Sequence, residues 1–123
     1  MKATGEPELV LDVEHLKQYT LGDVALEREV LQMFLEQCGL YLERLQQAQT
    51  VQDWGESCHS LKGSASGVGA FKLSAHAARL ETIEPLPKGE ARATLLDALQ
   101  KDVESTRHAI ISHLDKNSAT ASL

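Results

Sequence analysis

Apolar residues recur every three or four positions through most of the chain, a spacing that predicts helices and no strands. We expect a short first helix over residues 12–19, capped by Asp12, and a break at Thr20, Leu21 and Gly22. Four further helices are expected over residues 23–49, 50–68, 71–83 and 90–114. Asp23 and Thr50 are the expected caps of the first two of these.

Each expected helix has one apolar face. The expected inward positions are Val13 and Leu16; Val30, Phe34, Cys38, Tyr41 and Leu45, widened by Leu31, Leu35 and Leu42; Trp54, Cys58, Leu61, Ala65 and Val68; Leu73, Ala77, Leu80 and Ile83; and Leu95, Leu99, Val103, Ile110 and Leu114. Amphipathic helices joined by brief loops predict an all-α fold, an antiparallel four-helix bundle with a short additional N-terminal helix packed across one end. We expect one domain over residues 9–115, with disordered tails over residues 1–8 and 116–123.

Composition narrows the function. Hydrophobic residues make up 42% of the chain but aromatic residues only 4%, so the core must be built from Leu, Ala and Val. The formal net charge of −6 argues against a nucleic-acid binder and gives no reason to expect attraction to anionic lipid. The two cysteines fall at inward helical positions and are expected to be reduced thiols. Neither a signal peptide nor a stretch of about 20 apolar residues is visible, and we expect a cytoplasmic protein.

The third expected helix carries an unusual outward row. When its apolar face is turned inward, His59, Lys62, Gly63 and Ser66 lie outside, with Ser64 beside them. Gly63 alone costs about 1 kcal/mol relative to alanine in a helix interior. This concentration of glycine and serine around one histidine indicates that a partner needs close access to the imidazole.

These residue types suit phosphoryl transfer. Neutral imidazole is a competent nucleophile near physiological pH, and Lys62 can offer its ammonium group to phosphoryl oxygens. Gly63 removes a side chain that would obstruct the incoming phosphate and its donor. From His59 to Glu81 the sequence contains three cationic side chains and one carboxylate, which gives this segment a formal charge of +2 on an acidic chain. Such a patch suits docking onto an acidic, phosphate-bearing pocket.

The segment HSLKGSASGVGAFKLSAHAARLE, residues 59–81, resembles the signature of the histidine-containing phosphotransfer (HPt) family. That signature is roughly H-x-x-K-G-(S/A), followed by Gly-(Ala), Leu and a terminal Leu-Glu or Leu-Gln. His59 matches the phospho-accepting histidine, and Lys62 and Gly63 match the Lys-Gly pair beside it. Glu81 falls at a position where the family residue can lie near the histidine and orient its ring. Ser64 and Ser66 are expected to support the site.

The resemblance implies a phosphocarrier that is not itself a kinase and has no ATP site. Its partners would be receiver domains of response regulators, including that of a hybrid histidine kinase, in a multistep His-Asp relay. It would need no cofactor of its own, because the receiver supplies Mg²⁺ and the aspartate. We expect a monomer that docks over the third helix, with Leu16 and Tyr19 of the first helix as contributors.

Three other interpretations remain open from the sequence. A dimerisation fragment of a sensor kinase also presents a phospho-accepting histidine, but usually with an acidic residue where Ser60 stands. A non-catalytic helical adaptor would have no need of the Lys-Gly-Ser face. A zinc site from Cys58, His59 and another histidine lacks recognisable ligand spacing. The remaining histidines, namely His15, His76, His108 and His113, are expected at surface or boundary positions without a role.

Overall fold

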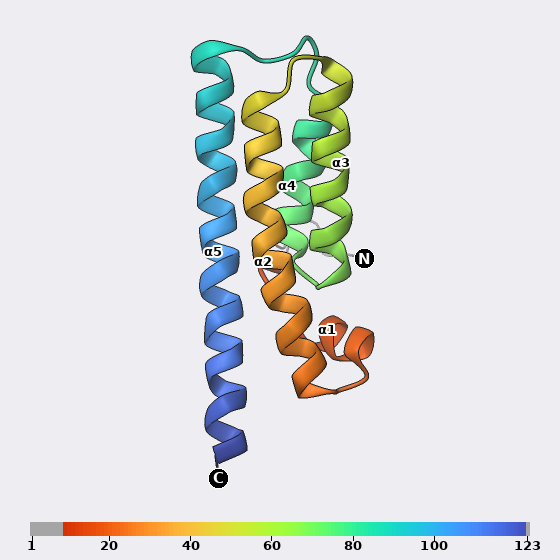
Figure 1. Cartoon of the computed structure of the whole chain (residues 1–123), viewed down its shortest axis with the longest axis vertical. Helices are drawn as coiled ribbons and strands as arrows, with labels where there is room; N and C mark the ends of the chain where they lie inside the picture. The colour runs from red at the N-terminus through yellow and green to blue at the C-terminus, as the bar shows by residue number, and fades with distance from the viewer. Residues whose placement is uncertain (1–8, 123) are drawn as a thin grey trace, which may run out of the picture.

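The computed structural model describes residues 9–122, with side chains to residue 117, and all regular structure within that range is helical. The helices are α1 (Val13–Thr20), α2 (Val24–Gln47), α3 (Val51–Gly67), α4 (Phe71–Glu81) and α5 (Gly89–Ser122). Helices α2 to α5 run side by side in alternating directions, and α1 lies across the lower end, below α3 (Figure 1). The predicted antiparallel bundle with a short extra helix is confirmed.

The predicted helix starts are confirmed by their caps. The Asp12 carboxylate accepts a hydrogen bond from the His15 N–H at 3.1 Å, and the Asp23 carboxylate accepts one from Leu26 N–H at 3.0 Å. Thr50 Oγ1 accepts a hydrogen bond from the N–H of Asp53, also at 3.0 Å. Each bond satisfies a backbone donor that has no partner within the first turn of its helix.

The C-terminal ends of the helices differ from the sequence prediction by more residues than the starts do. Helix α4 stops at Glu81, two residues early, because Pro85 excludes Glu84 from helical backbone angles and Thr82 folds back to donate to the Arg79 carbonyl. Helix α5 instead continues to Ser122, through most of the expected tail over residues 116–123. No glycine or proline interrupts that stretch. Residue 123 and the expected tail over residues 1–8 lie outside the described part of the chain.

The core follows the predicted apolar faces, most completely on α3. The five predicted inward positions of this segment are all buried, namely Trp54, Cys58, Leu61 and Ala65 of α3 and Val68 directly after it. The α5 face differs: Leu96 is buried while Leu95 only packs partly against the core, and Thr106 occupies an inward position. Thr106 Oγ1 donates to the Asp102 carbonyl at 2.8 Å, so its hydroxyl is satisfied and a polar residue is tolerated there.

Two of the histidines expected at surface or boundary positions are part-buried, and each of them joins two helices. Near the lower end of the bundle, His113 Nε2 of α5 lies 2.5 Å from the carboxylate of Glu27 on α2, which is only 2% exposed. The Asn117 side-chain amide donates to the same carboxylate oxygen at 3.1 Å. Higher in the bundle, His76 of α4 lies 2.5 Å from Asp102 of α5. Helix α5 is therefore fastened to both of its neighbours by carboxylate–imidazole contacts.

None of the helices in residues 9–122 has a stretch apolar enough and long enough to cross a bilayer.

The Glu27–His113 contact gives the first testable prediction. We expect His113→Ala to lower the free energy of unfolding by about 1–3 kcal/mol, because a buried carboxylate loses a hydrogen-bonding partner. His108→Ala, at an exposed position on the same helix, is the matched control and should change stability by less than about 0.5 kcal/mol. Urea unfolding followed by circular dichroism measures both. Equal stability of the two variants would contradict the assignment.

Candidate functional site

The outward face of α3 presents His59 to solvent. Its side chain is 68% exposed, whereas the neighbouring Cys58 is buried in the core. Gly63 is also exposed, and Lys62 and Ser66 are half-buried. The predicted outward row therefore lies on one face of the helix, opposite the buried one.

Helix α4 brings a carboxylate to that row. Glu81, its last residue, places Oε2 3.1 Å from His59 Nδ1 and Oε1 2.9 Å from Lys62 Nζ. One carboxylate thus joins two α3 side chains that lie three residues apart. Helix α3 packs more extensively against α4 than any other pair of helices does. We use "the His59 site" for His59, Lys62 and Glu81 together.

Two bonds between α3 and α4 hold the site in place. Trp54 Nε1 donates to the Leu80 carbonyl at 2.8 Å, directly before Glu81 in the chain. Further down, Ser74 Oγ donates to the Lys62 carbonyl at 3.0 Å. Neither bond was predicted from the sequence, because a tryptophan on an apolar face and a serine on a helix give no sign of their distant partners.

The electrostatics of the site favour an ionised Glu81. The hydrogen bond from Lys62 is the largest influence and lowers the pKa of the Glu81 carboxyl group, and the His59 hydrogen bond lowers it further. Desolvation acts in the opposite direction but does not prevail. An ionised carboxylate can only accept, so it favours the tautomer in which Nδ1 carries the proton. That tautomer leaves the lone pair on Nε2, where it could act as a nucleophile.

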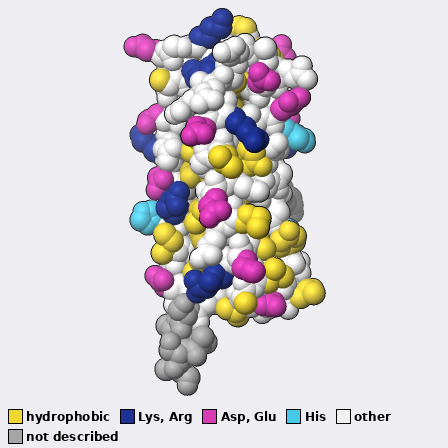
Figure 2. All heavy atoms as spheres, in the orientation of Figure 1, with side chains coloured by type: hydrophobic (Ala, Val, Ile, Leu, Met, Phe, Trp, Pro, Cys, Tyr) yellow, Lys and Arg dark blue, Asp and Glu magenta, His cyan; other side chains and the backbone are white. Residues whose placement is uncertain are grey.

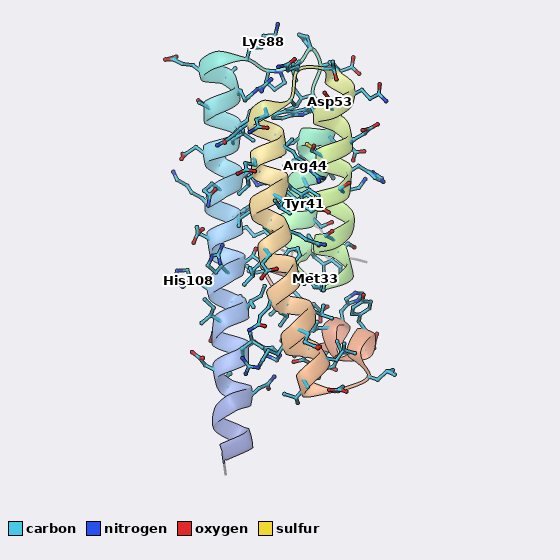
Figure 3. The ribbon with its side chains drawn as sticks, in the orientation of Figure 1. Met33, Tyr41, Arg44, Asp53, Lys88 and His108 are labelled. Atoms are coloured by element: carbon cyan, nitrogen blue, oxygen red, sulfur yellow. The ribbon has the colours of Figure 1, made fainter. Side chains whose placement is uncertain are left out.

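The two candidate serines do not join this set. Ser64 Oγ lies 3.5 Å from the Tyr41 hydroxyl, so it faces α2 rather than α4. Among the described side chains, no hydrogen bond joins Ser66 to His59, Lys62 or Glu81. Ser64 therefore belongs to the flank where α2 borders α3, and Figure 3 places Tyr41 on that side of α2.

Cys58 is poorly suited to the zinc binding that was considered from the sequence. Burial raises the pKa of its thiol to about 12, with the Glu81 charge acting in the same direction, and burial raises that of Cys38 to about 12 as well. Both remain protonated thiols at neutral pH, and the thiolate is the form that attacks or binds metal. Within residues 9–117, no three side chains of His, Cys, Asp or Glu are grouped to hold a metal ion.

The glycines of the motif serve different purposes. A Cβ atom on Gly63 would have no heavy atom within 4 Å, so the space around this glycine is open. Gly69, between α3 and α4, has φ +87° and a Cβ there would lie 2.7 Å from the Asp12 carbonyl oxygen. Asp12 N–H in turn donates to the Gly69 carbonyl at 2.8 Å. Gly69 is required by the backbone, whereas Gly63 is not.

That difference gives the second prediction. Gly63→Ala should stabilise the fold by up to about 1 kcal/mol, because alanine favours the helix and meets nothing. Gly69→Ala should destabilise it by more than about 1 kcal/mol, through both the left-handed backbone and the clash with Asp12. Thermal unfolding of the two variants measures the contrast. A Gly63→Ala variant that unfolds like Gly69→Ala would show that Gly63 is a packing residue.

The third prediction concerns the Glu81 carboxyl group. Its pKa should lie below the ordinary value of 4.5, and Lys62→Gln should raise it more than His59→Gln does, because the lysine hydrogen bond is the larger influence. Since the folded-state pKa is lowered, the stabilisation from these contacts is present above the unfolded-state pKa and is lost as the pH falls through the folded-state value. Carboxyl ¹³C chemical shifts followed against pH report the change. A larger rise in His59→Gln would reverse the order of the two contacts.

Comparison with known proteins agrees with this geometry. The family model described as "Hpt domain" matches residues 29–109, from the first turns of α2 into α5, and so covers the whole His59 site. No curated protein and no solved structure matches the chain significantly. The matched region spans well over half of the 123 residues. The chain belongs to the Hpt domain family, whose members carry out histidine phosphotransfer in two-component phosphorelays.

Proposed function

We propose that His59 accepts a phosphoryl group from the aspartyl phosphate of one receiver domain and passes it to the aspartate of another, within a multistep relay that includes a hybrid histidine kinase. The observation that carries this proposal is the exposed imidazole held by Glu81 through Nδ1 at 3.1 Å, with Lys62 on the same carboxylate. This contact uses Nδ1, and among the described residues the other ring nitrogen, Nε2, has no hydrogen-bonding partner.

The transfer step requires little from this chain. The Nε2 lone pair attacks phosphorus, the bond from phosphorus to the aspartate oxygen breaks, and the carboxylate leaves with the electron pair. The Nδ1 proton stays on the ring, and the Glu81 carboxylate offsets the positive charge that develops there. The reverse step returns the phosphoryl group to a receiver. In this proposal the receiver supplies the Mg²⁺ that balances the charge of the phosphoryl group, so the chain would need no cofactor of its own.

Lys62 is suited to share its charge between two groups. Its ammonium group lies 2.9 Å from Glu81 Oε1 and its side chain is 34% exposed. A flexible lysine stem allows the ammonium group to reach phosphoryl oxygens on the neighbouring ring while Glu81 remains close. We propose that it stabilises the charge on the transferred group.

Gly63 borders an apolar hollow that suits docking of the receiver. Tyr19, Met33 and Gly67 help to line this hollow, and Tyr19 and Met33 are large exposed side chains. Hydrophobic side chains gather over α1 and the first half of α2, in the lower right of Figure 2. Leu16 was expected to contribute, but it is fully buried and serves the core instead. We propose that a receiver covers His59 and extends down over this hollow.

The other interpretations have less support. A dimerisation fragment of a sensor kinase builds its four-helix bundle from two chains, whereas α2 to α5 of this single chain lie together as a bundle (Figure 1). This arrangement favours a monomeric carrier, which we place in the cytoplasm with its receivers. A non-catalytic adaptor would not need an exposed imidazole held through Nδ1.

The fourth prediction tests the proposed function. Incubation with a phosphorylated receiver should give acid-labile, base-stable phosphate on the wild-type chain and none on His59→Gln. The substitution should leave the helical content unchanged, because the side chain is exposed. His108→Gln, another exposed histidine on α5, is the matched control and should accept phosphate normally. Normal labelling of His59→Gln would show that another residue is the acceptor.

A further inference from the structure

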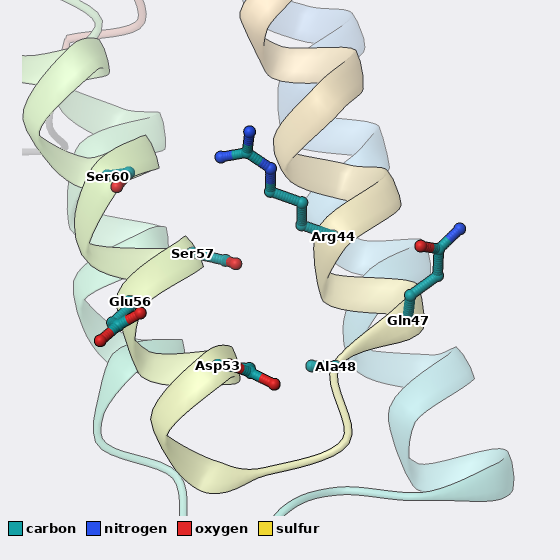
Figure 4. A pocket seen from close by; sticks show the side chains of 7 residues that line it. All are labelled: Arg44, Gln47, Ala48, Asp53, Glu56, Ser57 and Ser60. Carbon is teal, nitrogen blue, oxygen red and sulfur yellow. The ribbon is translucent and has the colours of Figure 1, made fainter.

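A polar groove between α2 and α3 adjoins the His59 site. It is lined by Arg44 and Gln47 from α2 and by Asp53, Glu56, Ser57 and Ser60 from α3 (Figure 4). A separate hollow contains His59 and Glu81, and it shares Glu56 and Ser60 with the groove. The two depressions therefore meet on the same turn of α3. A protein that covers His59 on this side also covers the groove.

Arg44 is the cation of this groove. Figure 4 shows its guanidinium group directed across the groove toward the turn of α3 that carries Ser60. The Arg44 side chain is exposed, and no ion pair among the side chains of residues 9–117 includes it. Lys62 differs, because its charge is offset by Glu81 at 2.9 Å. Arg44 thus offers an uncommitted positive charge beside the site.

Tyr41 lies one turn before Arg44 and close to its guanidinium group. The Arg44 Cζ atom lies 5.8 Å from the centroid of the Tyr41 ring, within the range of cation–π attraction. The Tyr41 hydroxyl in turn lies 3.5 Å from Ser64 Oγ on α3. Cation–π attraction uses none of the guanidinium N–H donors as hydrogen bonds, so they remain able to bind a carboxylate in a bidentate manner.

The charges around Arg44 indicate which group it would bind. Asp53 and Glu56 line the same groove, so without Arg44 this surface would repel an acidic partner. A receiver that transfers from an aspartyl phosphate brings carboxylates to this region. We infer that Arg44 is a receiver-binding residue that binds an acidic side chain of the receiver across the α2–α3 groove. This inference rests on the proposed function and adds a contact outside the His59 site.

The test measures transfer to the full chain with increasing concentrations of a phosphorylated receiver. Arg44→Ala should raise the half-saturating receiver concentration about tenfold, as expected for loss of one charge pair, and leave the maximal transfer rate unchanged. Arg44→Glu should raise it further, and Arg44→Lys, which keeps the charge but loses the planar donors, should lie between wild type and Arg44→Ala. Added salt should raise the half-saturating concentration of the wild type more than that of Arg44→Ala, because salt screens the charge pair that the variant lacks.

The matched control is Lys101→Ala, which removes an exposed cation from α5 and should behave as wild type. A wild-type half-saturating concentration for Arg44→Ala and Arg44→Glu would overturn the inference. A lower maximal rate with unchanged half-saturation would overturn it too, since Arg44 would then act on the phosphoryl group. Either result leaves the proposed function intact if His59→Gln still blocks labelling. Failure of the wild-type chain to accept phosphate from any receiver would refute both.

Discussion

The packing of α3 against α4 is the constraint on which the rest of the site depends. The Trp54 indole of α3 is fully buried and donates to the Leu80 carbonyl, which fixes the end of α4 beside the first half of α3. Glu81 follows directly and is therefore delivered to the exposed face that carries His59 and Lys62. A rotation of either helix would take the apolar faces out of contact, and it would also move the Glu81 carboxylate away from His59 and Lys62. Core packing and the orientation of the imidazole are consequences of the same contact.

The same kind of contact is used at three places in the bundle with different results. His59 pairs with Glu81 between α3 and α4, His76 with Asp102 between α4 and α5, and His113 with Glu27 between α5 and α2. The His76 and His113 side chains are 13% and 10% exposed, so these pairs connect helices and are closed to a partner protein. Only the His59 pair leaves most of its ring in solvent. Exposure, more than the chemical nature of the pair, separates the proposed phospho-accepting histidine from the two that join helices.

The structure shows which of the positive charges near α3 are paired within the chain. Lys62 is paired with Glu81, a charge that the formal +2 of the motif already takes into account. Lys72 also lies 3.6 Å from Asp102, which is outside the motif, so the +2 overstates the charge available for docking. Arg44, which lies outside the motif on α2, contributes a cation at the edge of the site instead. A count along the sequence could not identify it, because the groove it lines forms only when α2 packs beside α3.

The sequence by itself determined the helices, their caps and the face of α3 that is buried, because these depend on local spacing and on side chains within one turn. It also placed His59, Lys62 and Gly63 on one outward row for the same reason. The tertiary structure decided that the Glu81 carboxylate contacts both His59 and Lys62, and that Ser64 faces Tyr41. It also decided that α5 would extend past Leu114, where Asn117 reaches Glu27. These features depend on the rotation and overlap of whole helices, which hydrophobic periodicity within one helix does not specify.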